Sequence, residues 1–266
     1  MRVSVLFVSI LALALQSSGV EIIGHRGASF DAPENTLSSF RLGYEQKADG
    51  VELDIHLTKD GKIVVMHDYD TGRVGGSTNK IVDSTLAELR SYEIGRWSKW
   101  TNANFHEKIP LLSEVLPIIP PGKKLFIEIK TGPEIVPELV EVIKNSNSKP
   151  EQLVIITFNF ESAIVAKKML PQLKTHWLVG YAKDKTTGKF PDLKQTIARA
   201  KAGHLDGLDL NLNWPLTKET VGEIKRAGLE CHVWTVDDAA KAKELAKAGV
   251  DSITTNRPGW LREQLR

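Results

Sequence analysis

The stretch GVELDIHLTKDGKIVVMHD, residues 50–68, contains the pattern that decides the fold. Acidic and apolar residues alternate at its start, so Glu52 and Asp54 point to one face of a β-strand while the apolar residues between them point to the other. Asp60-Gly61 predicts a two-residue hairpin turn, because both positions can adopt a positive φ. Pairing outward from that turn sets Asp54 opposite His67, and we expect the hairpin to return His67 to the two carboxylates.

Similar short segments rich in β-branched residues recur along the chain and alternate with amphipathic, helix-like segments. The eight predicted strands are residues 21–25, 51–57, 125–130, 153–158, 175–180, 207–211, 231–236 and 252–256. The main helix-like stretches are residues 34–46, 134–145, 161–170, 192–202, 217–227 and 237–248. Strands that each lead into a helix predict an α/β fold, a (β/α)8 TIM barrel.

One segment, at about 69–109, interrupts this alternation. It is rich in Gly, Ser, Asn and Trp, only residues 84–90 have a helix-like pattern, and it is longer than a usual connection. We interpret it as a small insertion after the second strand, over the barrel mouth, where such loops shape the substrate pocket. The expected organisation is one domain over residues 20–266 that contains this insertion.

Composition limits the possible partners. The chain has 266 residues, of which 41% are hydrophobic, so it can bury a large core, and its formal net charge is only +2. No broad basic surface favours nucleic acid, and any anion must be recognised locally. The single cysteine, Cys231, lies in a strand-like run and is expected to be a buried, inert thiol. The sequence does not indicate the oligomeric state.

The first residues differ from the rest. Arg2 supplies a basic start, the run from Val3 to Leu15 is largely apolar, and small residues follow. This pattern predicts a signal peptide over residues 1–19, cut near Ser17 to Gly19, and hence export to the periplasm or the medium. The apolar run is short for a membrane span, so we expect no stable membrane anchor. A buried first helix or an uncleaved anchor is the alternative interpretation.

Three acidic residues indicate a metal site. Glu128 and Lys130 lie two apart on a predicted strand, as Glu52 and Asp54 do on theirs. Either pair alone is most often part of a solvated strand face, but these strands are otherwise apolar, and buried acids need a cation. Near the carboxyl ends of barrel strands the three acids can converge on one hard ion, Mg²⁺ or Ca²⁺.

The segment GHRGAS, residues 24–29, ends the first predicted strand. Gly24 and Gly27 flank His25 and Arg26, and we expect the two glycines to let the backbone approach a ligand closely. His25 is then a candidate acid or base beside a phosphate-binding guanidinium. Asn35 is the expected N-cap of the helix that follows.

Together these segments resemble one known family over essentially the whole mature chain. GHRG, PENT, the 50–68 stretch, IPLLSEVL, IEIK and VWTV occur here in the order seen in glycerophosphodiester phosphodiesterases. The resemblance implies metal-dependent hydrolysis of a small-molecule glycerophosphodiester to glycerol 3-phosphate and an alcohol. The site residues that it implies are Glu52, Asp54 and Glu128 for the divalent cation, His25 and His67 as acid and base, and Arg26 and Lys130 for phosphate.

The resemblance also implies that the glycerol 2-hydroxyl of the substrate attacks first and forms a cyclic phosphate, which water then opens. The sequence leaves open which histidine acts first. Trp234 is a candidate pocket wall for the alcohol group, and ordinary core packing is the alternative for it. Asp237 and Asn256 depart from the residues that the family often carries there, and we expect neither to touch the catalytic set. His56 is expected to support the site from the rim. The other histidines are expected to be structural or surface residues: His106, His176, His204 and His232.

Two other functions remain compatible with such a barrel. The first is a lipid-directed phosphodiesterase, a lysophospholipase D or a sphingomyelinase D-like enzyme. Secreted enzymes of the latter kind usually carry disulfides, and a single cysteine argues against them. The second is a binding or adhesion protein that lost its chemistry, although every implied ligand and both histidines are present.

Overall fold

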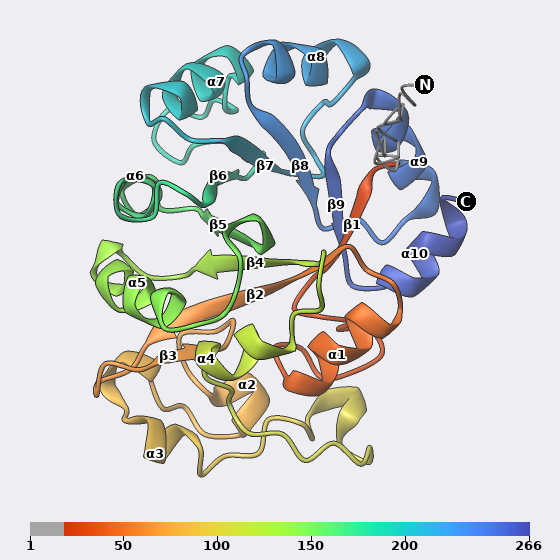
Figure 1. The fold of residues 1–266 in the computed structure, drawn as a ribbon. Helices are drawn as coiled ribbons and strands as arrows, with labels where there is room; N and C mark the ends of the chain where they lie inside the picture. The colour runs from red at the N-terminus through yellow and green to blue at the C-terminus, as the bar shows by residue number, and fades with distance from the viewer. Residues whose placement is uncertain (1–18) are drawn as a thin grey trace, which may run out of the picture.

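The computed structural model describes residues 19–266 (Figure 1). The predicted signal peptide lies outside the described residues, apart from Gly19. Within residues 19–266 we find no helix with the length and apolar character needed to cross a membrane.

Eight parallel strands close into a barrel, as predicted. Their order is β1-β9-β8-β7-β6-β5-β4-β2, and β1 also pairs with β2, which closes the ring. The strands are β1 (Glu21–Gly24), β2 (Gly50–Leu57), β4 (Lys124–Ile129), β5 (Leu153–Thr157), β6 (Lys174–Val179), β7 (Gly207–Asn211), β8 (Glu230–Trp234) and β9 (Ser252–Thr255). Every predicted strand is therefore present, and parallel pairing directs all eight carboxyl ends to the same mouth.

Helices surround this barrel (Figure 1). They are α1 (Leu37–Glu45), α4 (Leu112–Val115), α5 (Val136–Lys144), α6 (Phe160–Met169), α7 (Leu193–Ala202), α8 (Lys218–Arg226), α9 (Ala239–Ala248) and α10 (Pro258–Gln264). Most of the longer ones begin at a side-chain cap, because a short polar side chain can accept from the free N–H groups of the first turn. These caps are Thr36, Asn159, Asp192, Thr217 and Asp238.

The strands are buried on both faces, and their side chains alternate between two packing environments. On β4, Leu125 and Ile127 pack outward against the helices, while Phe126 between them joins a cluster inside the barrel. Ile23, Val154, Ile156 and Leu178 complete that inner cluster. Cys231 is buried in the outer layer of the other half, as expected, and burial raises the pKa of its thiol to about 12.

The hairpin after β2 differs from its predicted register by one residue. Strand β3 (Ile63–Val65) pairs antiparallel with β2 so that Leu57 faces Ile63, and Thr58 N–H donates to the Lys62 carbonyl. The loop therefore holds three residues, 59–61, and only Gly61 has a positive φ, 71°. This is a turn followed by a left-handed glycine, the usual three-residue hairpin. Continuing the pairing sets Asp54 opposite Met66 rather than His67, and Met66 N–H donates to the Asp54 carbonyl.

The insertion after the hairpin forms a small unit of its own. It contains only short helical segments, including α2 (Gly72–Gly75) and α3 (Leu86–Leu89), the latter inside the stretch predicted as helix. Its apolar side chains form a separate cluster beside the barrel, with Val74, Ile81 and Ile94 buried in it. The insertion therefore places polar residues near the carboxyl ends of the first strands without changing the barrel itself.

Candidate active site

Three buried carboxylates meet at the carboxyl-end half of the barrel. Glu52 and Asp54 point inward from β2, and Glu128 points inward from β4, where it lies directly beside Asp54 in the strand register. One oxygen from each residue lies within 4.8 Å of one from each of the others. The structure thus brings together the three acids predicted from the sequence.

These carboxylates lack enough partners within the protein. Burial, followed by the nearby charges of Asp54 and Glu128, raises the pKa of Glu52 well above its ordinary value. Burial and Asp54 likewise raise the pKa of Glu128 to about 7. Glu52 Oε1 is buried and accepts no hydrogen bond from the described residues, and the buried Asp54 Oδ1 has the Lys130 ammonium 3.2 Å away as its polar neighbour. Orphaned, like-charged oxygens with oxygen-only chemistry fit a hard divalent cation.

Two cations border the cluster. Lys130 Nζ lies 2.8 Å from Glu128 Oε1 and 3.2 Å from Asp54 Oδ1, and Arg26 Nε lies 3.5 Å from Asp54 Oδ2. Burial by itself would raise the pKa of Asp54, but the charges of Lys130 and Arg26 outweigh it and lower that pKa. Asp54 is therefore the anionic centre of the cluster.

The glycines beside Arg26 have a different role from the one expected. A Cβ on Gly24 would lie 2.7 Å from the Gly27 carbonyl oxygen, and one on Gly27 would lie 2.7 Å from the Ser39 carbonyl oxygen. The space that they leave is filled by this turn and by helix α1, so they do not open the backbone to a ligand. Gly27 has a φ of 86° and Arg26 one of 54°, and this tight turn directs Arg26 N–H to Glu52 Oε2 at 2.9 Å.

His25 lies at the end of β1 and is held from β9. Its Nδ1 is 2.7 Å from Asn256 Oδ1, and the Asn256 amide Nδ2 and backbone N–H both donate to Asp237. An amide oxygen can only accept, so Nδ1 carries the proton and Nε2 is the free ring atom. The expectation that Asp237 and Asn256 would not touch the catalytic set was therefore wrong for Asn256. Burial, followed by the charge of Arg26, lowers the pKa of His25 to about 4, so the imidazole is neutral near pH 7.

His67 borders the same cavity from the hairpin side. Its Nδ1 lies 2.7 Å from Asp68 Oδ1, and Arg73 from the insertion pairs with Asp68 at 2.7 Å. Burial lowers the pKa of His67, although the charge of Asp54 opposes this shift. His56 supports His67 from below, since its Nε2 is 3.3 Å from the His67 carbonyl oxygen. Each candidate histidine thus has one ring nitrogen held by a neighbour.

Sequence reasoning missed three residues of the site. Asn35 has a φ of 56° and donates from Nδ2 to Asp54 Oδ2 at 2.8 Å, while Thr36 takes the N-cap role expected for Asn35. Glu34 accepts from Arg26 at 2.7 Å and from Arg73. Asp209 on β7 lines the cavity, its Oδ1 has no hydrogen-bond partner within residues 19–266, and burial raises its pKa to about 6. For Asn35 and Glu34, the only signal in the sequence was a polar segment before a helix.

The cavity itself has a volume of about 70 Å³. Its lining includes His25, Arg26, His67, Lys130 and two of the three acids, and on the far side the apolar and aromatic residues Ile156, Phe158, Leu178 and Trp234. Trp234 packs edge-on against Phe158 with ring centroids 5.4 Å apart, and its indole N–H donates to the Asp209 carbonyl. It is thus both a pocket wall and a packed side chain.

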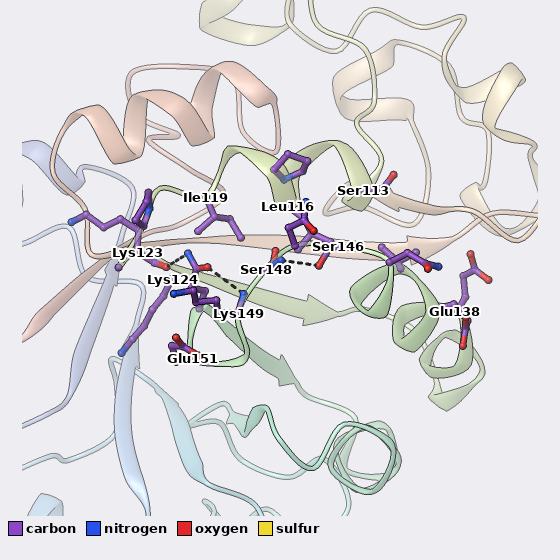
Figure 2. Close-up of a pocket in the computed structure, with 18 residues that line it drawn as sticks. Ser113, Leu116, Ile119, Lys123, Lys124, Glu138, Ser146, Ser148, Lys149 and Glu151 are labelled. Carbon is purple, nitrogen blue, oxygen red and sulfur yellow. Dashed lines mark hydrogen bonds between the residues drawn. The ribbon is translucent and has the colours of Figure 1, made fainter.

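A larger hollow of about 1070 Å³ lies outside the ring of strands, between α5 and the segment that leads from α4 to β4 (Figure 2). It is bordered by Lys123 and Lys124 at the start of β4, by Glu138 on α5, and by the loop that holds Gln152. It contains none of the predicted site residues. Because barrel enzymes carry their chemistry at the carboxyl ends of the strands, the smaller cavity is the candidate active site.

The fold and the site together indicate which class of enzyme this protein belongs to. A closed barrel presents acids suited to a hard cation, two cations suited to an anionic substrate, and two imidazoles suited to proton transfer. These groups are the components that catalyse hydrolysis at phosphorus.

Comparison with known proteins agrees with this class. The model of the glycerophosphoryl diester phosphodiesterase family matches residues 25–260. A glycerophosphodiester phosphodiesterase of Caldanaerobacter subterraneus subsp. tengcongensis is 35% identical over 252 residues, covering 92% of this chain and 97% of the relative. A glycerophosphodiester phosphodiesterase of Bacillus subtilis is 32% identical over 254 residues, covering 89% and 83%. The chain therefore belongs to the glycerophosphoryl diester phosphodiesterase family.

Solved structures show the same fold. A phosphodiesterase of Oleispira antarctica, in complex with the product sn-glycerol-3-phosphate, superposes with a TM-score of 0.80 at 28% identity and covers 92% of this chain and 96% of its own. A glycerophosphodiester phosphodiesterase of Thermotoga maritima gives a TM-score of 0.72 at 26% identity, with 92% and 97% covered.

Proposed function

We propose that this chain hydrolyses glycerophosphodiesters to glycerol 3-phosphate and an alcohol. The observation that carries the proposal is the cluster of three buried carboxylates with orphaned oxygens, set between two histidines and two cations. The Oleispira relative, which holds sn-glycerol-3-phosphate as its product, supports a glycerol phosphate product here as well.

Glu52, Asp54 and Glu128 would hold one divalent cation, Mg²⁺ or Ca²⁺. Such an ion, when bound, supplies neutralising charge for the phosphate oxygens. Arg26 and Lys130 are the phosphate-contacting groups, because each has donors left over beside the carboxylates. They hold the phosphate and stabilise the negative charge that gathers on its oxygens in the transition state.

His25 and His67 are the acid and base pair. In the first step the glycerol 2-hydroxyl oxygen bonds to phosphorus as the bond from phosphorus to the alcohol oxygen breaks. One imidazole takes the hydroxyl proton, and the other, which enters this step as an imidazolium, gives its proton to the departing alcohol. Water then opens the cyclic phosphate with the two roles reversed. Asn256 and Asp68 hold the far ring nitrogens, so that each histidine presents one defined atom.

Trp234 and Phe158 form the wall against which the alcohol group packs. A choline head group would suit this aromatic face. The partner is a small molecule.

We also propose that the chain is exported. The support is the basic and then largely apolar start of the sequence, followed by small residues at 17–19. Expressing the full chain and a variant that starts at Val20, then comparing the cytoplasmic, periplasmic and extracellular fractions, tests this proposal. Retention of both forms in the cytoplasm would contradict it.

A substrate panel tests the reaction. After chelation with EDTA, activity should be lost and should return with Mg²⁺ or Ca²⁺ on glycerophosphocholine or glycerophosphoethanolamine. Substrates that lack the glycerol 2-hydroxyl should be cleaved poorly, and equal turnover of the 2-deoxy analogue would refute the cyclic step. Faster turnover of lysophosphatidylcholine would favour a lipid-directed enzyme, and inactivity on every diester with every cation would favour a binding protein.

A further inference from the structure

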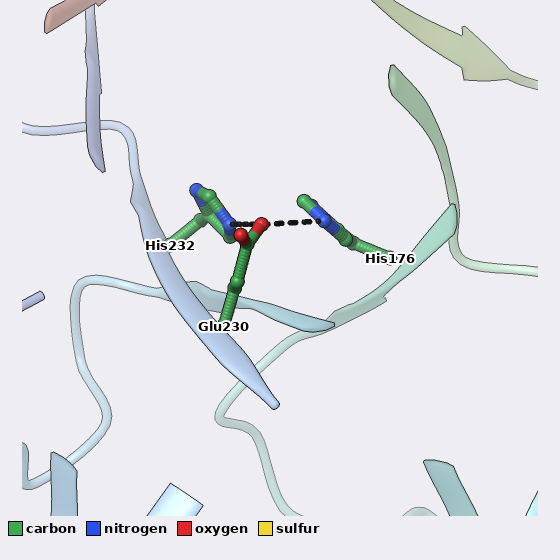
Figure 3. Close-up of side chains that lie close together, drawn as sticks. All are labelled: His176, Glu230 and His232. Atoms are coloured by element: carbon green, nitrogen blue, oxygen red, sulfur yellow. Dashed lines mark hydrogen bonds and ion pairs between the residues drawn. The ribbon is translucent and has the colours of Figure 1, made fainter. Parts of the chain in front are cut away.

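A second polar cluster lies inside the barrel, at the amino-end half (Figure 3). It consists of His176 on β6 with Glu230 and His232 on β8, and we call these three residues the lower cluster. Strand β7 lies between them and places Gly207 beside both His176 and Glu230. A Cβ on Gly207 would lie 2.8 Å from His176 Cδ2. The missing side chain therefore lets the imidazole reach across β7 toward β8.

The spacing within the lower cluster is that of metal ligands. His176 Nε2 and His232 Nε2 each lie 3.3 Å from Glu230 Oε2. The His232 contact is a hydrogen bond, and it is longer than charge-assisted ones, which measure about 2.7–2.9 Å. Two ligands of one zinc ion, each about 2.0–2.2 Å from it at an angle of about 90–110°, are separated by about 3.0–3.5 Å. One ligand atom from each of the three residues lies within 4.8 Å of the others.

The two imidazoles have ring nitrogens available for an ion. His176 is fully buried, its Nε2 has the 3.3 Å contact with Glu230, and its Nδ1 has no hydrogen-bond partner among the described residues. His232 Nδ1 lies 2.6 Å from Ser252 Oγ, and such a contact at the far nitrogen orients a ligating histidine.

The rings stack with centroids 4.3 Å apart and planes at 18°, so both Nε2 atoms face the same carboxylate oxygen. Because the ring planes are nearly parallel, both rings must turn about their soft terminal torsions to aim their lone pairs at one ion. Glu230 is partly exposed, and the half-exposed Lys174 contacts its other oxygen, Oε1. Oε2 therefore remains for the cluster, and the Glu230 side gives an ion a path from solvent.

We propose that the lower cluster is a second metal site, distinct from the three carboxylates, which binds a divalent transition-metal ion of the zinc class. Two imidazole nitrogens and one carboxylate oxygen are a donor set that suits Zn²⁺, whereas the all-oxygen set above suits Mg²⁺ or Ca²⁺. The ion would fasten β6 to β8 across the glycine of β7.

Tag-free protein, stripped of metal, is titrated with Zn²⁺ by calorimetry in an excess of Mg²⁺, which occupies the carboxylate site. We expect one equivalent of Zn²⁺ to bind and to raise the Tm. His176→Leu should lose that equivalent and the rise in Tm. The matched control His204→Ala, which removes an exposed histidine, should keep both. No Zn²⁺ binding by the unmodified protein, or binding that His176→Leu leaves unchanged, would overturn the proposal and leave a hydrogen-bonded cluster without metal.

If His176→Leu fails to fold, anomalous diffraction at the zinc edge from crystals of the unmodified protein decides the matter. A peak bonded to His176, Glu230 and His232 supports the site. A zinc peak only among the carboxylates, or none, refutes it.

Discussion

Both ends of the barrel interior contain acidic residues, but the two ends differ in how far neighbouring side chains neutralise them. At the carboxyl end Glu52 and Glu128 are crowded with Asp54, and their pKa values are raised because the fold does not neutralise them. At the amino end, the carboxylate of Glu230 is flanked by His176, His232 and Lys174, and these partners outweigh burial and lower its pKa. At the carboxyl end only an added hard cation can neutralise the crowded acids, whereas at the amino end Lys174 already pairs with Glu230 and two imidazole nitrogens remain for a softer ion.

The largest effect is expected when Glu52, one of the three crowded acids, is replaced by an uncharged residue. We expect Glu52→Gln to lower kcat/KM on glycerophosphocholine at least about a thousandfold. The same change should raise the Tm of the metal-free protein, because the amide keeps the acceptor for Arg26 N–H and removes a buried charge. Assays beside Glu138→Gln, a control in the larger hollow, test both effects. A variant that loses both activity and stability would contradict the functional assignment of this end.

Replacing His25 and His67 one at a time distinguishes the acid from the base at the carboxyl end. His25→Ala and His67→Ala should each lower kcat about a hundred- to ten-thousandfold on a choline diester. A p-nitrophenyl diester has a leaving group that needs no proton. The variant that lacks the first-step acid should therefore recover most of its activity on it, while the other variant should not. Equal losses on both substrates would show that neither histidine protonates the alcohol.

Asp209, which also lines the cavity, tests whether another buried charge there destabilises the folded state. Its pKa is raised from 3.8 to about 6 by burial. The folded state therefore binds the Asp209 proton more tightly than the unfolded state does. Below about pH 4 this difference does not change the free energy of unfolding, and between about pH 4 and pH 6 it lowers that free energy increasingly. At about 1.4 kcal/mol per pKa unit, Asp209→Asn should gain up to about 3 kcal/mol in unfolding free energy near pH 7 and little near pH 4.

Urea unfolding of the metal-free proteins at both pH values measures this difference. A gain that does not change with pH would mean that the charge of Asp209 is not its cause.

The smallest effect is expected from Asn256, which makes a hydrogen bond with His25. Asn256→Ala frees the imidazole Nδ1 and should lower kcat about tenfold without a comparable change in KM. Asp237→Asn should cost less, since its side chain still offers an oxygen to the Asn256 N–H groups. Steady-state kinetics on both variants measure the two effects, and a larger loss for Asp237→Asn would show that Asp237 acts other than through Asn256.

The sequence predicts this barrel and its main site well, because period-two alternation on a strand fixes which side chains share a face. Glu52, Asp54 and Glu128 follow from that rule and from the common direction of parallel strands. The hairpin register was wrong by one residue, since a left-handed Gly61 can close either a two- or a three-residue loop.

Most of the contacts that sequence reasoning missed are long-range. Asn256 and His25 are 231 residues apart, and nothing local indicates that they touch. Asn35 was expected to cap a helix, and only the packing of the first turn against β2 turns its side chain to Asp54. His176 and His232 were set aside as structural or surface residues, because their convergence depends on a glycine in the strand between them.

A crystal structure of the protein with Ca²⁺ and glycerol 3-phosphate tests the central claim most directly. We expect one calcium ion bonded to oxygens of Glu52, Asp54 and Glu128, with the phosphate between Arg26 and Lys130. Glycerol 3-phosphate bound elsewhere, with no ion among the three carboxylates, would contradict the account.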